Sequence, residues 1–217
     1  MTQSALTPPT DGSLRYLALG DSYTIGEAVP PEMRWPVLLA DSLRARGSAV
    51  GDPEIIAQTG WTTDELSAAI DKADPQGPYD LVTLLIGVNN QYRGGNLDVY
   101  RTEFRALLRR ATVFAGGKAG HVIVVSIPDW SVTPFAADDV RSPQEIGERI
   151  DAFNEVAREE TALTGAHFVD ITPYSRTAAT DPSLVAGDGL HPSGAMYIGW
   201  AERVLPVALD ALADTAR

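Results

Sequence analysis

The feature that most constrains this chain is a regular alternation between short apolar runs and longer segments with a helical period. Five runs are rich in Val, Ile, Leu or Phe and short enough to be buried strands, at residues 14–20, 54–57, 80–86, 121–127 and 166–171. Because a helix-length segment follows each run, we expect consecutive strands to run parallel, with helices covering both faces of the sheet. The alternation therefore predicts an α/β fold, a three-layer α/β/α sandwich on a five-stranded parallel sheet.

The segments between the runs carry apolar residues three and four positions apart, which is the spacing of one helix face. They predict helices around residues 35–43, 66–73, 97–111, 146–157 and 197–205. Thr62 and Glu65 form a capping-box pattern ahead of the second helix. Pro206 lacks a backbone N–H, so we expect it to kink or interrupt the last helix.

The organisation of the chain predicts one domain. Its 217 residues contain no linker, internal repeat or low-complexity segment, and 44% hydrophobic with 21% charged residues is an ordinary globular composition. We expect residues 1–13 to form a flexible polar arm and residues 14–217 a single domain. The arm has neither the basic nor the apolar region of a secretory signal, and no stretch reaches the roughly 18 apolar residues of a membrane span. The expected location is the cytoplasm.

Charge and residue counts argue against several classes of function. The chain has no cysteine, which excludes thiol nucleophiles and cysteine-ligated zinc or iron–sulfur sites, and its three histidines argue against a histidine-rich metal site. The formal net charge of −12 argues against a nucleic-acid partner. Because the Walker and GxGxxG patterns are also missing, we expect neither a metal nor a cofactor.

Residues with chemical potential follow the expected strands. In a parallel α/β sheet, ligands bind outside the carboxyl ends of the strands. Ser22 follows the first strand, Gly60 the second and Asn89 the third, while Asp188 and His191 lie in a loop beyond the fifth. We therefore expect these five residues to share one rim of the sheet.

This set of residues suits acyl transfer by a serine. A serine hydroxyl needs a base within hydrogen-bond reach, and the base needs an acceptor on its other ring nitrogen. Ser22 fits the nucleophile and His191 the base, and Asp188 is close enough in sequence to orient the imidazole. Backbone N–H groups of Ser22 and Gly60 and the side-chain amide of Asn89 are the expected oxyanion donors.

Two other aspartates are alternatives. Asp129 follows the fourth strand and is a rival for the orienting acid, but Asp188 is preferred because its spacing from His191 needs no long-range coincidence. Asp21 is adjacent to Ser22, and we expect it to make turn and loop hydrogen bonds.

With these blocks in order, the chain resembles the SGNH hydrolases, the GDSL-type esterase/lipase superfamily, which supply Ser, Gly, Asn and His from four successive blocks. The blocks read GDSYT around Ser22, QTGWTTDEL around Gly60, GVNN around Asn89 and DGLHP ending at residue 192. The resemblance spans residues 14–205 and implies a flavodoxin-like strand order, with the first strand central and next to the switch point. It also implies the residue roles assigned above.

The chain departs from the family pattern at two positions. Tyr23 stands where the family usually has Leu, and we expect it to serve packing. Asn90 stands where the family usually has Asp, and we expect it to act as a hydrogen-bond acceptor that orders the loop.

Aromatic residues near the strand ends are candidates for a substrate pocket. They are Trp61, Tyr92, Trp130 and Phe135, and the last two belong to a long irregular stretch at residues 128–142. Ligand pockets are mostly apolar, so these side chains are predicted to bind substrate, with local packing as the alternative.

Together these features predict a serine esterase that hydrolyses small-molecule carboxylic esters through a Ser–His–Asp triad and an acyl-enzyme intermediate. Three alternatives use the same site: an acyltransferase, a thioesterase and a lysophospholipase. A fourth is a non-catalytic binding domain on this fold.

Overall fold

Five parallel strands form one sheet in the order β2-β1-β3-β4-β5. The computed structural model describes residues 13–213, so the expected arm lies, except for Ser13, outside the described residues. The strands are β1 (Tyr16–Gly20), β2 (Glu54–Ala57), β3 (Leu81–Leu85), β4 (Val122–Val125) and β5 (His167–Val169). The flavodoxin-like order is confirmed, with one correction. β1 is next to the edge strand and the middle of the sheet is β3, although β1 does border the switch point.

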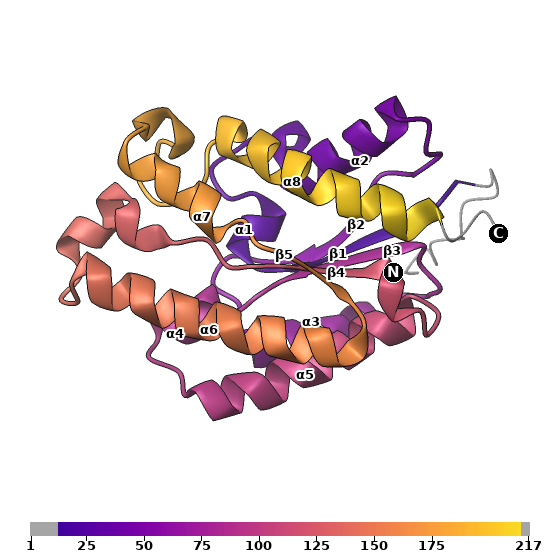
Figure 1. Ribbon diagram of the computed structural model, residues 1–217, viewed down its shortest axis with the longest axis horizontal. Coiled ribbons are helices and arrows are strands. Elements are labelled where there is room, and N and C mark those ends of the chain that lie inside the picture. The colour runs from indigo at the N-terminus through magenta and orange to yellow at the C-terminus, as the bar shows by residue number, and fades with distance from the viewer. Residues whose placement is uncertain (1–12, 214–217) are drawn as a thin grey trace, which may run out of the picture.

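Helices cover both faces of this sheet (Figure 1). On one face lie α2 (Trp35–Ala45) and α8 (Gly194–Ala213), and on the other lie α3 (Thr63–Ala73), α5 (Leu97–Phe114) and α6 (Pro143–Thr164). Three short helices follow strand ends: α1 (Ser22–Ile25), α4 (Val88–Tyr92) and α7 (Thr172–Ser175). Single 3-10 turns occupy Pro31–Met33, Ala119–His121, Trp130–Val132, Pro134–Asp138, Arg176–Ala179 and Pro182–Leu184. The predicted three layers are confirmed.

The core is continuous through the sheet. Every residue of β1, β3 and β4 is buried, as expected for strands covered on both sides. Trp35 and Trp200 fill the layer beneath α2 and α8, while Tyr100 and Phe153 stack with ring centroids 4.6 Å apart beneath α5 and α6. Buried aromatic pairs of this kind contribute beyond their buried area. The strands whose carboxyl ends carry the site are therefore held between two well-packed layers.

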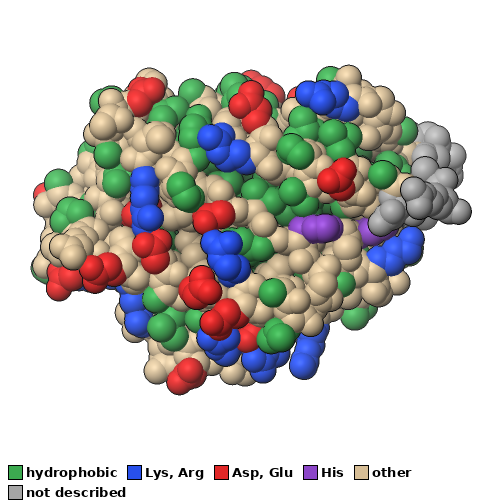
Figure 2. All heavy atoms as spheres, viewed as in Figure 1, with side chains coloured by type: hydrophobic (Ala, Val, Ile, Leu, Met, Phe, Trp, Pro, Cys, Tyr) green, Lys and Arg blue, Asp and Glu red, His purple; other side chains and the backbone are tan. Residues whose placement is uncertain are grey.

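Ion pairs add a polar tie between α5 and α6. Glu160 is only 2% exposed, and its carboxylate accepts from Arg105 Nε at 2.6 Å and from Arg101 Nη1 at 3.0 Å. These hydrogen bonds hold the pKa of Glu160 at about 2, against the opposing effect of burial. Figure 2 shows acidic and basic side chains interspersed on the face in view, mostly over the half where α5 and α6 lie.

The helix at the end of the chain differs from expectation. Pro206 does not interrupt α8, which runs on to Ala213. Pro206 is exposed, while Val204 and Ala208 on either side of it are buried against the sheet. This packing offsets the cost of a proline inside a helix, which is about 3 kcal/mol relative to alanine.

Gly20 closes β1 directly before the site, and its lack of a side chain has a steric reason. A Cβ atom at this position would lie 2.5 Å from the carbonyl oxygen of Leu85 and would also collide with Thr24. Backbone on β3 cannot yield without breaking the sheet pairing. Glycine therefore allows β1 to pass into α1.

We predict that Gly20→Ala lowers the free energy of unfolding by about 1–3 kcal/mol, the usual cost of overpacking a rigid site. Urea unfolding measures the change. Gly120→Ala is the matched control, because a Cβ atom there meets nothing within 4 Å, and it should be nearly neutral. Equal stabilities for the two variants would contradict this steric explanation.

Candidate active site

The register of the sheet brings the predicted residues together. Gly20 is paired with Ala57 of β2 and with Leu85 of β3, so these three strands end at the same level. The segments that follow them, with the loop beyond β5, enclose a cavity of about 130 Å³. Its lining includes Ser22, Gly60, Asn89 and His191, together with Tyr23, Thr59, Val88, Tyr92, Trp130, Phe135 and Leu190.

Ser22 is the first residue of α1, and Asp21 caps this helix. The Asp21 Oδ1 atom accepts from Tyr23 N at 3.0 Å, and its carbonyl oxygen accepts from Ile25 N at 2.9 Å. The N–H groups of a first helical turn have no partner within the helix, so Ser22 N–H is a donor not used by α1. Asp21 therefore makes turn hydrogen bonds, as expected, and it does so as the cap of α1.

His191 is held by Asp188 across one turn. The Nδ1 atom of His191 lies 2.6 Å from Asp188 Oδ2, and Asp188 Oδ1 accepts from the backbone N–H groups of Leu190 and His191 at 3.0 Å. Burial alone would raise the pKa of Asp188, but these hydrogen bonds hold that pKa below its usual range. The ring therefore has a carboxylate on Nδ1, and its Nε2 makes no hydrogen bond to any residue in the described part of the chain.

Backbone bonds fix the shape of the loop that carries this pair. Ala186 N donates to His191 O at 2.7 Å, and Ser193 N donates to Leu184 O at 2.9 Å. Gly189 turns the chain with φ 74°, a conformation that suits glycine. Tyr23 adds a side contact, with its ring edge-to-face to His191 at 5.6 Å between centroids. This is the packing role expected for Tyr23.

Ser22 and His191 line the same cavity. Among the described residues, the only side-chain hydrogen-bond partner of His191 is Asp188, so Ser22 and His191 are not directly hydrogen-bonded. Ser22 is 5% exposed and His191 is 7% exposed, so both are screened from bulk water. The geometry thus brings a hydroxyl and an oriented imidazole to one apolar chamber.

The other predicted donors, Gly60 and Asn89, follow β2 and β3 and both line the cavity. The Asn89 Nδ2 atom donates to the carbonyl of Trp61 at 2.9 Å, which uses one of its two hydrogens and leaves the other for the cavity. Asn90 accepts from Thr63 N at 3.1 Å and donates to Thr63 Oγ1 at 2.8 Å. The asparagine that replaces the family's aspartate therefore accepts a hydrogen bond and orders the loop, as expected.

Aromatic side chains form one wall of the cavity. Tyr92, Trp130 and Phe135 pack with centroids 5.5 to 6.1 Å apart, and all three line the cavity as predicted. Tyr92 is 44% exposed and Phe135 is 40% exposed, so the cluster forms part of the mouth. The lining does not include Trp61, whose indole packs against the core.

Asp129, the alternative orienting acid, and the two histidines other than His191 are not part of the Asp188–His191 pair. Asp129 accepts from Arg176 Nε at 2.8 Å and from Ser131 N at 2.9 Å, so its carboxylate anchors the 128–142 loop and does not face a histidine. His121 precedes β4 and His167 begins β5. Both histidines are therefore at the amino ends of the strands, opposite the site, which agrees with a structural role.

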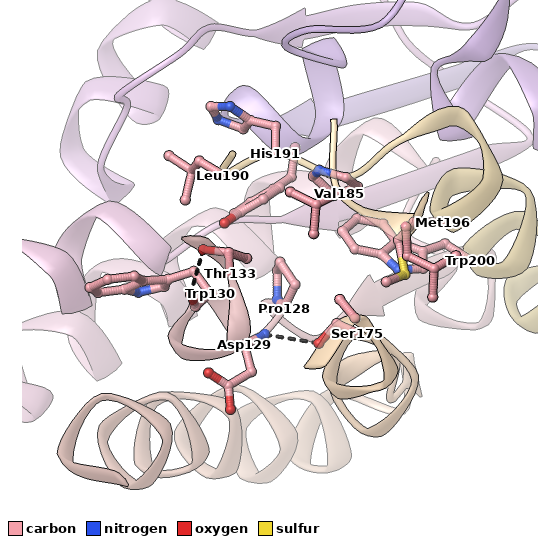
Figure 3. Close-up of a pocket in the computed structure, with 14 residues that line it drawn as sticks. Pro128, Asp129, Trp130, Thr133, Ser175, Val185, Leu190, His191, Met196 and Trp200 are labelled. Carbon is pink, nitrogen blue, oxygen red and sulfur yellow. Dashed lines mark hydrogen bonds between the residues drawn. The ribbon is translucent and has the colours of Figure 1, made fainter. Parts of the chain in front are cut away.

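A second, smaller cavity of about 20 Å³ lies behind the first. Tyr23, Trp130, Leu190 and His191 line both cavities and form the wall between them. Figure 3 shows Leu190 and Trp130 on one side of this space, Met196 and Trp200 on the other, and the Asp129 carboxyl directed away toward α6. This volume holds about one water molecule, so the second cavity adds little room for a ligand.

Within residues 13–213, no cluster of three or more His, Asp or Glu side chains is arranged to hold a metal ion. The helices of the same part of the chain are each too short or too polar to cross a membrane.

Arg93 makes contacts that the sequence does not predict, since its loop is expected to face solvent, with contact to an acidic group of a substrate as the alternative. Its guanidinium donates to Gly60 O at 2.7 Å and pairs with Glu65 at 3.2 Å. These partners are about thirty positions away in the chain, and no spacing rule connects them. The only visible signal was a basic residue just after the Asn89–Asn90 block.

Comparison with known proteins shows to which family the chain belongs and which solved structures share its fold. The model of the GDSL-like Lipase/Acylhydrolase family matches residues 18–197, which include all four blocks. An arylesterase from Vibrio mimicus is 26% identical over 191 residues, covering 86% of this chain and 84% of that protein. The solved structure of TesA has a TM-score of 0.72 at 18% identity, covering 91% of this chain and 99% of that chain. A lipase/acylhydrolase from Enterococcus faecalis has a TM-score of 0.69 at 20% identity, covering 89% and 94%.

The environment of Asp21 generates a prediction about pH. Asp21 is fully buried, its Oδ2 atom has no hydrogen-bond partner among the described residues, and burial raises its pKa to about 7. Between about pH 4 and that value, the unfolded chain is ionised at this carboxyl while the folded protein still holds the proton. The contribution of Asp21 to the free energy of unfolding therefore decreases as pH rises from about 4 to about 7.

We predict that Asp21→Asn, which keeps a capping oxygen, gains stability relative to the wild-type protein as pH rises from about 4 to about 7, with no further gain above. Urea unfolding at a series of pH values measures the gap between the two proteins. A gap that stays constant, or that shrinks with rising pH, would show that the buried carboxyl does not retain its proton.

Proposed function

We propose that this chain, a carboxylic ester hydrolase that belongs to the GDSL-like lipase/acylhydrolase family, uses Ser22 as its nucleophile, His191 as its general base and Asp188 as the orienting carboxylate. The observation that carries the proposal is the 2.6 Å contact between Asp188 and His191 Nδ1, on a ring that lines the same cavity as Ser22. An imidazole oriented in this way beside a serine is the arrangement that nucleophilic catalysis requires.

In the first half of the reaction, Ser22 Oγ attacks the ester carbonyl carbon while its proton passes to His191 Nε2. The carbonyl oxygen becomes an oxyanion that accepts hydrogen bonds from Ser22 N, Gly60 N and Asn89 Nδ2. The intermediate then collapses, the bond to the alcohol oxygen breaks, and His191 donates its proton to the departing alcohol. An acyl-enzyme on Ser22 remains.

In the second half, water takes the place of the alcohol. His191 accepts a proton from the water, whose oxygen attacks the acyl carbon, and the acid leaves as the proton returns to Ser22. Asp188 stays ionised throughout, because hydrogen bonds hold its pKa below the usual range. Its negative charge stabilises the imidazolium that forms in both halves.

The cavity supports small ester groups as substrates. Its volume of about 130 Å³ is close to that of an apolar cavity of about 150 Å³ that accommodates benzene. Tyr92, Trp130 and Phe135 line the cavity, and the Vibrio mimicus relative is named an arylesterase. We therefore propose short acyl chains and compact or aromatic alcohols.

Variants of the triad test the assignment of roles. We predict that Ser22→Ala and His191→Ala each lower kcat by about 10⁴–10⁶-fold, and that the double variant loses little more, because the residues act as a unit. Asp188→Asn should lose less than His191→Ala, since the base itself remains. Turnover of a short aryl ester measures each loss.

Asp129→Asn is the control for this series, since Asp129 binds Arg176 and faces no histidine. It should keep its kcat while losing stability. A His191→Ala protein with near-normal turnover, or losses that multiply in the double variant, would show that another residue activates Ser22.

A second prediction concerns the size and fate of the substrate. Aryl acetates and butyrates should be cleaved with higher kcat/KM than the corresponding palmitate, because a long chain exceeds the cavity. Free acid should be the main product when competing alcohols are present. Faster cleavage of the palmitate would contradict the size limit, and ester products would favour acyl transfer over hydrolysis.

A further inference from the structure

Three side chains of one short segment hold three backbone groups of the segment that contains Gly60. Arg93 donates to the carbonyl of Gly60, Asn89 donates to the carbonyl of Trp61, and Asn90 accepts from the N–H of Thr63. Residues 60–62 lie between β2 and α3 and have no sheet pairing of their own. Apart from a turn bond from Trp61 N to Gln58 O and the capping box at Thr62, their conformation is held by α4 and by Arg93, which follows it.

Arg93 makes two bonds at once. Its Nη2 atom lies 2.7 Å from Gly60 O, and its Nη1 atom lies 3.2 Å from Glu65 Oε2. The same Glu65 oxygen accepts from Thr62 N at 2.9 Å, within the capping box of α3. The backbone N–H of Arg93 donates to Asn89 O at 3.1 Å. One guanidinium thus joins Gly60, the start of α3 and the end of α4.

Gly60 needs this support more than another residue would. Its φ is 90°, in a region that glycine enters freely and does not prefer strongly. The Trp61 N–H donates to Gln58 O at 3.3 Å, a long turn bond across Gly60, so the Arg93 guanidinium is the group that holds the Gly60 carbonyl directly. A donor for an oxyanion must point in one direction before the charge develops, because preorganisation is what makes it effective.

We propose that Arg93 is a positioning residue for the reaction: through the Gly60 carbonyl it fixes the peptide plane that follows Gly60, and this plane together with the φ of 90° sets the direction of the Gly60 N–H. Arg93 is absent from the cavity lining, so it acts through Gly60 and not on the substrate. The inference rests on the proposed role of Gly60 as an oxyanion donor. The planar fork of arginine explains the residue type, since two acceptors must be reached together.

The test is the variant Arg93→Ala. We expect kcat for a short aryl ester to fall about 10–100-fold, the size of effect that a slightly misplaced group produces, with KM nearly unchanged. Inactivation by an aryl phosphonate should slow by a similar factor, because the phosphoryl oxygen uses the same donors. Thermal unfolding shows whether the variant is folded.

Arg110→Ala is the matched control. Arg110 also joins α3 to a neighbouring helix through a backbone carbonyl and a carboxylate, with 3.0 Å to Ser67 O and 2.6 Å to Asp71, but it touches nothing in residues 60–63. It should lose similar stability and keep its kcat. A folded Arg93→Ala protein whose kcat and phosphonate reactivity match those of Arg110→Ala would overturn the proposal.

Arg93→Lys separates geometry from charge. An ammonium group keeps the charge but does not span both acceptors, so we expect kcat to stay well below the wild-type value. Wild-type turnover in this variant would show that charge alone suffices and would overturn the positioning role.

Asn89→Ala distinguishes failure of this inference from failure of the proposed function. Loss of a direct oxyanion donor should lower kcat by about 10²–10³. If Asn89→Ala shows that loss and Arg93→Ala shows none, the oxyanion site stands and Arg93 does not position it. If neither variant affects kcat, the oxyanion site itself is misplaced.

Discussion

The site depends on one feature of the sheet: the parallel strands β1, β2 and β3 all end at the same level. Gly20 is paired with the last residue of β2 and with the last residue of β3, so the chain leaves all three strands at one height. The hydroxyl of Ser22, the N–H of Gly60 and the amide of Asn89 are delivered from there within a few residues. A register shift of one strand would separate these groups, because the rise per strand residue is about 3.3 Å.

Two carboxyl groups, one next to Ser22 in sequence and one bonded to His191, occupy opposite environments. Asp21 is fully buried with one oxygen unpartnered, and burial raises its pKa to about 7. Asp188 is partly exposed and receives three hydrogen bonds, which keep its pKa below the usual range. Below about pH 7 the first is therefore a neutral cap at the start of α1, whereas the second keeps a negative charge beside His191. The difference comes from environment, because the residue type is the same.

Local features of the sequence were enough to predict the strands, the layers and the pairing of Asp188 with His191, because each depends on periodicity or on spacing within one turn. Asp129 shows where such reasoning stops. Its partner Arg176 is 47 positions away, and only the folded chain shows that the pair anchors a loop. Arg93 and Gly60 are separated by 33 positions for the same reason. Trp61 follows a strand end as the other candidates do, but its side chain packs on the core, which local spacing does not determine.

The most direct test of the arrangement is a crystal structure of the protein after inactivation by an aryl phosphonate, which forms a stable copy of the tetrahedral intermediate. The phosphorus should be bonded to Ser22 Oγ, with its phosphoryl oxygen about 2.7–3.1 Å from Ser22 N, Gly60 N and Asn89 Nδ2. His191 Nε2 should face the remaining ester oxygen. An adduct on another residue, or a phosphoryl oxygen directed away from Gly60 and Asn89, would contradict the convergence of these strand ends on one catalytic centre.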